Sequence, residues 1–417
     1  MDTAYRHLRI DFSRFLADFE NLSQIGATGD GGVNRPSLTP ADREARAWFA
    51  RRAQESGVEV HTDAAGNQTA LLNCGRPGAP SFLIGSHLDS VPNGGRFDGA
   101  LGVTAALEVL RVVKDHELPL PVNLEVVNFT DEEGTLVGLL GSRALSGELE
   151  PEALRSPKCG RAVLEDLAAA AGLRVDQMPQ AARPKNSVAG YLELHIEQGE
   201  RLEKAGIPIG IVSSITGICG YRVTFLGRAD HSGTRPVPDR LDAGVGASGF
   251  LLAVREQVLR DYPGCTVNVG QMQFFPGAFN IVPERAVLAL EFRSPDPRQL
   301  QEMEMAILKT ARGQANRYNL QINSEPLYTE TPALMAESAQ AAFAAAAEGL
   351  GLRHMPLASF AGHDAQVMAR ICPAGMVFVP SVDGASHTPR EFTRPEDMEN
   401  GANVLLQAAL RMIAGME

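Results

Sequence analysis

The sequence predicts an α/β protein: a catalytic domain with a mixed sheet and helices on both faces, interrupted by an inserted ferredoxin-like α+β domain. Two observations favour this class. In the first half of the chain, apolar segments of strand length alternate with helical segments, which is typical of a layered α/β domain. From about residue 214 the order becomes β-α-β-β-α-β, the ferredoxin-like arrangement. A length of 417 residues leaves room for two to three domains.

The helices and strands of the first domain are predicted from end signals and periodicity. Thr39 is expected to cap a helix that has Pro40 at its first position and ends at Gly57. "SFLIGSHLDSV" and "PVNLEVVNFTDEEG" are apolar runs that turn polar at their ends, and the helical segment "GALGVTAALEVLRVVKDHE" separates them. "AGYLELHIEQGERLEKAG" continues the pattern as a strand followed by a helix. A sheet of buried strands is therefore expected.

The inserted domain is predicted from six segments. Strands are expected at "GYRVTFLGRA", "CTVNVGQMQFF", "RAVLALEFRS" and "NLQINSEPLYT". Long helices are expected at "DRLDAGVGASGFLLAVREQVLRDYPG" and "DPRQLQEMEMAILKTARGQANRY". We therefore predict one domain over residues 214–330, inserted into a discontinuous catalytic domain of residues 1–213 and 331–417.

The composition argues against several classes of partner and location. A formal net charge of −12 and an isoelectric point near 5.3 argue against nucleic acid and against an anionic membrane. Five scattered cysteines without a CxxC pair predict neither a disulfide scaffold nor a thiolate zinc site. No apolar run reaches ~18 residues, and the N-terminus does not resemble a signal peptide. A soluble, cytoplasmic protein is expected.

Histidines and acids gather at the polar ends of the predicted strands. "GSHLDS" places His87 and Asp89 two apart, so that one can bind a metal while the other accepts the second N–H of the imidazole. Asp98 starts a helix, where the helix dipole favours a carboxylate that could bridge two cations. His195 lies inside an apolar strand and His387 follows another.

Each of these residues has a simpler explanation, because a lone buried histidine is more often hydrogen-bonded core and an acid cluster such as "TDEEG" is more often a solvated turn. The occurrence of several such residues at the polar ends of predicted strands nevertheless favours a metal site. The polar ends of such strands meet at one edge of the sheet. A mixed nitrogen and oxygen ligand set suits hard and borderline cations.

Seven motifs in one order make the interpretation specific. They are "GSHLDSVPNGGRFDGALGV", "FTDEEG", "LELHIEQG", "RADHSGTRP", "NIVPE" with "LEFRS", "GHDA", and "VPSVDGASHTPREF". Together they resemble the metal-dependent amidohydrolases that cleave N-carbamoyl-L-amino acids, 3-ureidopropionate and allantoate, a branch of the aminoacylase/carboxypeptidase-type dinuclear metallohydrolases. The resemblance covers about residues 10–412. It implies the same discontinuous α/β domain, with the inserted domain acting as a lid.

The resemblance also implies the metal site. Two divalent ions are expected, with zinc, manganese, cobalt and nickel all compatible with the ligands. The ligands would be His87, Asp98, Glu133, His195 and His387, with Asp98 as the bridge. Glu132 would be the general base, because an unligated carboxylate beside two cations takes the proton of the attacking water. Asp89 and His363 would support the ligands from behind.

The expected substrate contacts are Gln198, His231, Asn280 and Arg293. A guanidinium binds a carboxylate through two parallel hydrogen bonds, so Arg293 suits a substrate carboxylate. His231 and Asn280 would polarise the scissile carbonyl or the ureido group. In relatives the lid histidine reaches the site of a neighbouring subunit, which implies a homodimer through the lid domain.

The expected reaction converts an N-carbamoyl-L-amino acid to the L-amino acid, CO2 and ammonia. Allantoate or ureidoglycolate is the alternative substrate. An aminoacylase or exopeptidase activity is a further alternative, and a catalytically inactive binding protein is the alternative from another class. Two departures leave the substrate open: relatives often read "EEGxRF" where this chain has "EEGTLVG", and "HAGTTPM" where it has "HSGTRPV" with Arg235. Asp131 has no expected role beyond that of a solvated or structural acid.

Overall fold

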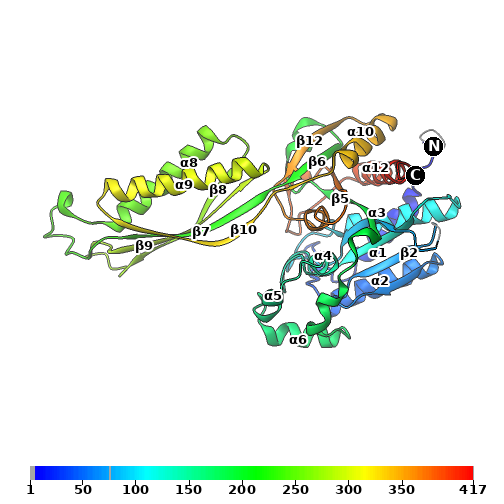
Figure 1. The fold of residues 1–417 in the computed structure, drawn as a ribbon, viewed down its shortest axis with the longest axis horizontal. Coiled ribbons are helices and arrows are strands. Elements are labelled where there is room, and N and C mark those ends of the chain that lie inside the picture. The colour runs from blue at the N-terminus through cyan, green and yellow to red at the C-terminus, as the bar shows by residue number, and fades with distance from the viewer. Residues whose placement is uncertain (1–4, 75–76, 417) are drawn as a thin grey trace. The chain divides into compact units, whose positions relative to one another are not determined.

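The computed structural model describes residues 5–74 and 77–416 (Figure 1). The described residues form two compact units. The first comprises residues of Met1–Ser213, Leu334–Leu357 and Ala361–Glu417, and the second comprises Ser214–Ala333 with Ala358–Phe360. The predicted division into a catalytic domain and a lid stays a prediction, because compactness alone does not show that either part works as such.

A mixed sheet of nine strands confirms the predicted fold class. Its order is β1-β2-β4-β3-β5-β13-β6-β11, and β12 pairs with β6. The central strands β3, β4, β5 and β13 are parallel, whereas β1 with β2, β2 with β4, and β6 with β13 are antiparallel. The strands are β1 (Glu59–Thr62), β2 (Gln68–Leu72), β3 (Ser81–His87), β4 (Asn123–Phe129), β5 (Val188–Ile196), β6 (Ile209–Ile215), β11 (Ala333–Leu334), β12 (His354–Ser359) and β13 (Ala374–Val379).

Helices lie on both faces of this sheet, as the alternation along β5 shows. Leu192, Leu194 and Ile196 join the hydrophobic core under helices α1, α3, α10 and α12. The alternate residues Glu193 and His195 point to the other face, where α11 contacts β5. The helices of this unit are α1 (Phe12–Ser23), α2 (Pro40–Glu55), α3 (Ala100–Asp115), α4 (Leu140–Ser146), α5 (Pro151–Arg155), α6 (Arg161–Ala170), α7 (Arg201–Ala205), α10 (Glu337–Gly349), α11 (Asp364–Met368) and α12 (Pro395–Ala414), with 3₁₀ turns at η1 (Val175–Ala181), η2 (Lys185–Ser187) and η4 (Val382–Gly384).

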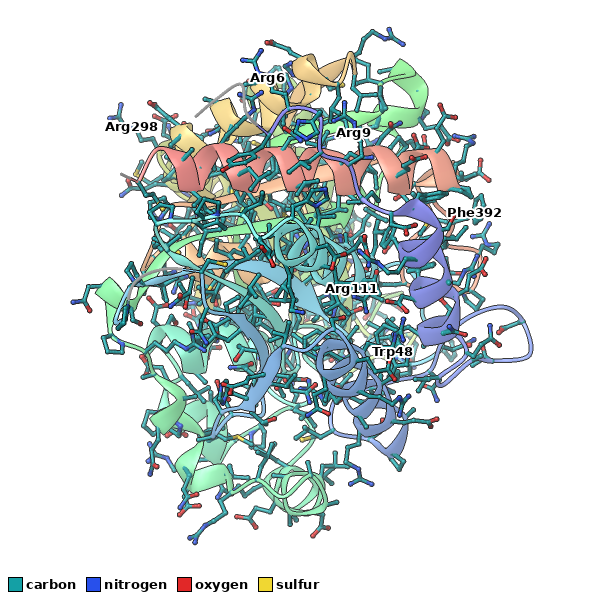
Figure 2. The ribbon with its side chains drawn as sticks, turned by 90° about the vertical axis from the view of Figure 1, so that its right-hand side faces the viewer. Arg6, Arg9, Trp48, Arg111, Arg298 and Phe392 are labelled. Carbon is teal, nitrogen blue, oxygen red and sulfur yellow. The ribbon has the colours of Figure 1, made fainter. Side chains whose placement is uncertain are left out.

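Buried ion pairs join the first helices. Arg111 of α3, labelled in Figure 2, places Nη1 2.6 Å from Oδ2 of Asp18 on α1. Arg52 of α2 holds the other oxygen of Asp18 at 2.7 Å. The start of α2 is as predicted, because the Thr39 side chain accepts from the Asp42 amide and Pro40 is the first residue. One buried carboxylate therefore ties three helices together.

The second unit has the predicted β-α-β-β-α-β order. It comprises β7 (Gly217–Leu226), α8 (Ala243–Asp261), β8 (Thr266–Phe275), β9 (Arg285–Ser294), α9 (Pro297–Arg317) and β10 (Gln321–Glu330), with a 3₁₀ turn η3 (Val237–Asp239). Its antiparallel sheet has the order β10-β7-β9-β8, and α8 and α9 share a core with one face of it. Within the described ranges, no helix is long and apolar enough to cross a membrane.

Gly102 tests how closely α3 packs on the sheet. A Cβ at this position would lie 2.4 Å from the carbonyl oxygen of Leu194 on β5. We expect Gly102→Ala to lower the free energy of unfolding by about 1–3 kcal/mol, because the helix must move away from the strand. The matched control is Gly313→Ala in α9, where a Cβ meets nothing within 4 Å. That change should stabilise by up to about 1 kcal/mol. Urea denaturation of both variants measures the contrast, and equal effects would contradict it.

Candidate metal centre

Two buried histidines come from neighbouring parallel strands. His87 ends β3 and His195 lies next to the end of β5, and neither is more than 1% exposed. Nδ1 of His87 lies 3.0 Å from the carbonyl oxygen of Asp89, and Nδ1 of His195 lies 2.9 Å from that of Ile196. A carbonyl oxygen only accepts, so each Nδ1 donates its proton. The lone pair of each neutral imidazole is therefore on Nε2, as a metal ligand requires.

Asp98 lies between the histidines. Its Oδ1 is 3.4 Å from Nε2 of His87 and 3.0 Å from Nε2 of His195, and its Oδ2 is 3.5 Å from Nε2 of His387. Burial by itself raises the pKa of Asp98, but the three imidazoles outweigh burial and hold that pKa well below its usual value. The two carboxylate oxygens thus face two different sets of neighbours.

Glu133 and His387 complete the second set. Oε2 of Glu133 is 3.3 Å from Nε2 of His387, and Oε1 of Glu133 accepts from the Val91 amide at 3.3 Å. Burial raises the pKa of Glu133 to about 8, and a hydrogen bond to Asp98 raises the pKa of His387 to about 9. His387 has a positive φ of 55° and a side chain that is about half exposed. His387 therefore reaches the cluster from its solvent-exposed side.

These residues fit a pair of cations. His87, Asp98 and His195 have ligand atoms within 4.8 Å of one another, and so do Asp98, Glu133 and His387. The two groups share only Asp98. Nε2 of His87 is buried and has no hydrogen-bond partner among residues 5–74 and 77–416. Leaving a buried polar atom unpaired is costly, and a cation at this position removes the cost.

Glu132 lies beside the cluster without belonging to either group. Its Oε2 is 3.6 Å from Nε2 of His87, and its side chain is 8% exposed. Burial raises its pKa well above the usual value, and Asp364, Glu133 and Asp98 add to this effect while His87 opposes it. The two adjacent glutamates therefore have different environments.

Asp89 makes two kinds of contact, one through its carboxylate and one through its carbonyl oxygen. Its carboxylate oxygens accept from the backbone amides of Glu132 and Glu133, each at 3.3 Å. The carboxylate is 3.8 Å from Nδ1 of His87, and the carbonyl oxygen of the same residue takes that proton instead. Asp89 thus accepts the second N–H of the His87 imidazole through its carbonyl oxygen, and its carboxylate positions the two glutamates.

Asp131 is a buried structural acid, not a solvated one. It is fully buried at a positive φ of 57°. Its carboxylate accepts from the amides of Leu136, Val137 and Gly138 at 2.6–2.9 Å and from the Thr135 hydroxyl at 3.2 Å. The three amide contacts are to the backbone, so they do not depend on which side chains stand at positions 136 and 137. Asp131 therefore fixes the backbone of the "TLVG" segment that follows the glutamates.

Three residues that the sequence did not indicate also hold the cluster. Oε1 of Glu391 accepts from the amides of Phe97 and Asp98 at 2.8 and 3.0 Å. Ser386 donates to Oδ2 of Asp98 at 3.3 Å. Glu193 is buried on β5 and accepts from Ser86, Tyr191 and the amide of Ala365. The only available signal was an acid or hydroxyl near a predicted ligand, which is too common to select them.

The remaining predicted residues of the first unit lie against the same cluster. Gln198, expected at the substrate, donates its amide to Oδ2 of Asp98 at 2.7 Å. The ring of His363 is 4.6 Å from that of His195, edge to face. Burial lowers the pKa of His363 well below its usual value. Gln198 thus contacts one predicted ligand by a hydrogen bond and His363 contacts another by ring packing, and their roles stay predictions.

The other predicted substrate contacts belong to the second unit. His231 pairs with Ile281 in an isolated bridge, and the Ser232 amide donates to the Asn280 carbonyl at 3.1 Å, so that His231 and Asn280 lie on adjacent segments. Both are exposed. The Arg235 guanidinium donates to the Asp239 carbonyl at 2.9 and 3.1 Å. Arg235, which lies at the second departure from the relatives, therefore bonds to the backbone of its own loop.

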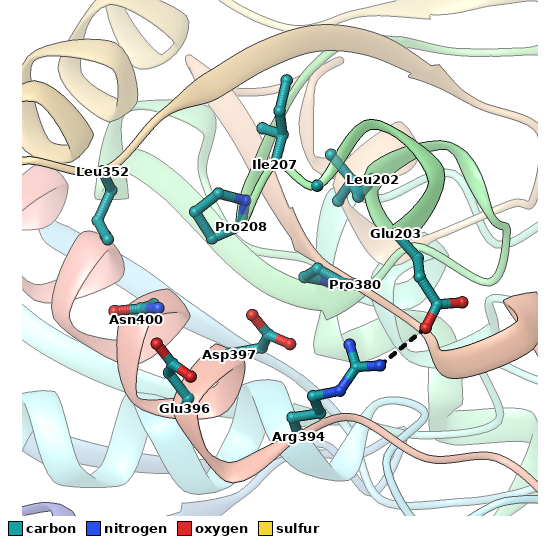
Figure 3. Close-up of a pocket in the computed structure, with 11 residues that line it drawn as sticks. Leu202, Glu203, Ile207, Pro208, Leu352, Pro380, Arg394, Glu396, Asp397 and Asn400 are labelled. Atoms are coloured by element: carbon teal, nitrogen blue, oxygen red, sulfur yellow. Dashed lines mark hydrogen bonds and ion pairs between the residues drawn. The ribbon is translucent and has the colours of Figure 1, made fainter.

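A cavity of about 310 Å³ lies elsewhere in the first unit (Figure 3). Arg394 and Glu203 form an ion pair of 3.0 Å at its edge, and burial raises the pKa of Asp397 in its wall to about 6. None of the predicted site residues lines this cavity. The metal centre is therefore defined by its side chains and not by this cavity.

The mixed α/β fold and the cluster of histidines and carboxylates fit the class of metal-dependent hydrolases. The family model of peptidase family M20/M25/M40 matches residues 83–411. N-carbamoyl-L-amino acid amidohydrolase of Geobacillus stearothermophilus is 40% identical over 397 residues, which are 94% of this chain and 97% of the relative. Ureidoglycolate hydrolase of Arabidopsis thaliana is 34% identical over 95% of this chain and 86% of the relative.

A solved structure agrees with these relatives. The amidase of the hydantoinase/carbamoylase family from Burkholderia multivorans superposes with a TM-score of 0.85 at 35% identity, covering 97% of this chain and 98% of the other. The chain belongs to peptidase family M20/M25/M40, within the hydantoinase/carbamoylase amidases. It is a hydrolase of carbon–nitrogen bonds in linear amides other than peptide bonds, from a metal-dependent family.

Asp131 provides a test of the loop beside the metal centre. Asp131→Asn turns an amide N–H₂ toward backbone donors, so we expect a loss of about 1–3 kcal/mol for each amide left without an acceptor. Thermal and urea unfolding measure it. The control is Asp176→Asn, whose side chain is 64% exposed and pairs only with Arg174 among the described contacts. A surface change of this kind should stay within about 0.5 kcal/mol. Similar losses in both variants would refute the structural role.

Proposed function

We propose that the protein hydrolyses N-carbamoyl-L-amino acids to the L-amino acid, CO2 and ammonia, with two divalent cations at the candidate metal centre. The main support for this reaction is the shared carboxylate of Asp98, which belongs to both groups of ligand atoms. Glu132 lies beside these groups and belongs to neither. The high identity to a relative named for this reaction supports the substrate class.

His87, Asp98, Glu133, His195 and His387 would hold the cations, with Asp98 between them. Such a pair, when bound, acidifies and orients a water molecule. Glu132 takes the proton of the attacking water on Oε2 as the water oxygen joins the ureido carbon. One C–N bond of the ureido carbon then breaks, and the leaving nitrogen receives the proton that Glu132 held. The carbamic acid that remains breaks its other C–N bond, which releases CO2 and the second nitrogen as an amine. Asp89 keeps the backbone of Glu132 in place for both transfers.

Arg293 would bind the substrate carboxylate, and His231 and Asn280 would polarise the ureido group. Gln198 would serve the site through its hydrogen bond to Asp98 as well as through the substrate. The ligand set accepts zinc, manganese, cobalt and nickel, so elemental analysis of the purified protein must identify the metal. The cytoplasmic location expected from the sequence stays a prediction.

Ureidoglycolate is the second candidate substrate, because relatives named ureidoglycolate hydrolase are 34% and 32% identical over nearly the whole chain. Ammonia release from N-carbamoyl-L-amino acids, allantoate and ureidoglycolate, with each metal added, separates these candidates. N-acetyl amino acids and dipeptides belong in the same panel. Activity on those alone would replace the proposal by an aminoacylase or exopeptidase.

The neighbours Glu132 and Glu133 serve as controls for each other. Glu132→Ala should lower kcat by roughly 10²–10⁴-fold, the usual contribution of a positioned general base, and should keep its metal. Glu133→Ala should instead lower the metal content measured by elemental analysis. Unchanged turnover in Glu132→Ala would remove it from the mechanism, and unchanged metal content in Glu133→Ala would remove that residue from the ligands.

We further propose that the second unit forms a homodimer with a second copy of the chain. Val245, Leu252 and Leu259 follow one another at seven-residue intervals on α8 and are 44–65% exposed. β8 is an edge strand of the sheet. An exposed apolar stripe and an unpaired edge both favour association, and a second copy offers the same pair of surfaces.

Charges on the α8 stripe should prevent this association. Leu252→Glu combined with Leu259→Glu is expected to sediment as a single chain of 44.6 kDa, and the unmodified protein is expected to sediment as a dimer. The control is Val163→Glu on α6, which is also exposed, at 46%. It should stay dimeric. A monomeric unmodified protein would contradict the homodimer.

A further inference from the structure

Glu291 and Arg293 lie side by side on the face of the small sheet that α8 and α9 do not cover. They are two residues apart on β9, so their side chains leave the same face. The alternate residues Leu288, Leu290 and Phe292 are buried in the core with the helices. The side chains of Glu291 and Arg293 are only about one-third exposed, although their face of the sheet is open.

The guanidinium of Arg293 is held on two sides. Nε and Nη2 both lie 2.8 Å from Oε1 of Glu291, and Nη1 donates to the Phe360 carbonyl at 2.6 Å. Five N–H groups are available on a guanidinium. Among residues 5–74 and 77–416, these contacts occupy three of them and leave one N–H on each terminal nitrogen. Two N–H groups on Nη1 and Nη2 can form an end-on fork, which binds a carboxylate through two parallel hydrogen bonds.

Tyr328 fixes Glu291 from two strands away. Its hydroxyl donates to Oε2 of Glu291 at 2.9 Å. The register places Tyr328 of β10 opposite Gly220 of β7, and Gly220 opposite Glu291 of β9. A Cβ on Gly220 would lie 2.5 Å from the Tyr328 ring. The missing side chain thus lets the tyrosine lie across β7 and reach the glutamate.

We propose that Glu291, held by Tyr328 across Gly220, is a positioning residue that presents the end-on fork of Arg293 to the substrate carboxylate and so sets the preference for carboxylate-bearing substrates. The inference rests on the proposed function, in which Arg293 binds that carboxylate. Holding a long side chain in one rotamer before binding removes the cost of ordering it from the free energy of binding. Glu291 also repels the substrate anion, so the proposal requires that positioning outweighs this repulsion.

Two variants separate the two effects. Tyr328→Phe removes one hydroxyl without changing any charge, and Glu291→Ala removes both the contact and the charge. KM and kcat are measured with an N-carbamoyl-L-amino acid and with its carboxamide, which lacks the anion. We expect KM for the acid to rise about threefold in Tyr328→Phe and about tenfold in Glu291→Ala, with smaller changes for the carboxamide. A lower KM in Glu291→Ala would overturn the proposal, because repulsion would then dominate.

The matched control is Glu325→Ala, which removes the Arg222–Glu325 ion pair of 3.0 Å between β7 and β10. Its KM should not change. In an Arg293→Ala background, Tyr328→Phe should have no further effect on KM, because nothing is left to position, and Glu291→Ala should only lower KM by removing the repulsion of the anion. A further rise in KM in either double variant would mean a structural role and would also overturn the proposal.

Arg293→Ala distinguishes this inference from the proposed function. If it raises KM while Tyr328→Phe and Glu291→Ala do not, the positioning role fails and the function stands. If it leaves KM unchanged for every carboxylate substrate, Arg293 does not bind the carboxylate and the positioning role fails with it, while ammonia release from the substrate panel still decides the proposed function. Independently of turnover, ¹⁵N NMR should show solvent exchange of the Arg293 Nε–H several-fold faster in Tyr328→Phe. Unchanged exchange would contradict the proposed restraint.

Discussion

The buried carboxylate of Asp98 is the interaction on which the rest of the centre depends. It faces three imidazoles, accepts from Gln198 and Ser386, and has its own backbone fixed by Glu391. A buried charge is tolerated only when it is paired and hydrogen-bonded. Other buried acids, among them Asp89, Glu133 and Glu391, surround it, and burial raises the pKa of each. Divalent cations would relieve this crowding of carboxylates, so metal binding and folding are expected to be linked.

The edge of the sheet at which the centre forms could be predicted from the sequence, because its signals are local. Apolar runs that become polar at their ends mark β3, β4 and β5, and parallel strands bring those ends to one edge. Thr39 and Pro40 mark the start of α2 in the same way, by side-chain chemistry at one position. The resemblance added the separate roles of Glu132 and Glu133, which repulsion between adjacent acids cannot give. In the structure the two glutamates have different neighbours: Glu132 lies near His87, and Glu133 lies near His387.

The supporting contacts could not be predicted, because they join side chains to backbone amides far away in the chain. Glu391 and Phe97 are separated by 294 residues, and a backbone amide carries no residue-specific signal. The same holds for Asp131, whose three amide partners are fixed by the loop conformation and not by side-chain type. The Tyr328–Gly220–Glu291 row depends on the register of three strands, and a shift by one residue would reverse every side chain in it.

This dependence on the backbone explains why the chain can differ from its relatives beside the centre and keep the centre itself. At "EEGTLVG" the backbone of the loop is held by amide contacts to Asp131, while Leu136 is buried in a hydrophobic cluster against which Val137 packs. At "HSGTRPV" the guanidinium of Arg235 bonds to a carbonyl oxygen of its own loop and leaves His231 exposed. Under the proposed function, the buried acids would fix the reacting groups through the backbone. The side chains at the two departures would then act on the substrate pocket and not on the metal ligands.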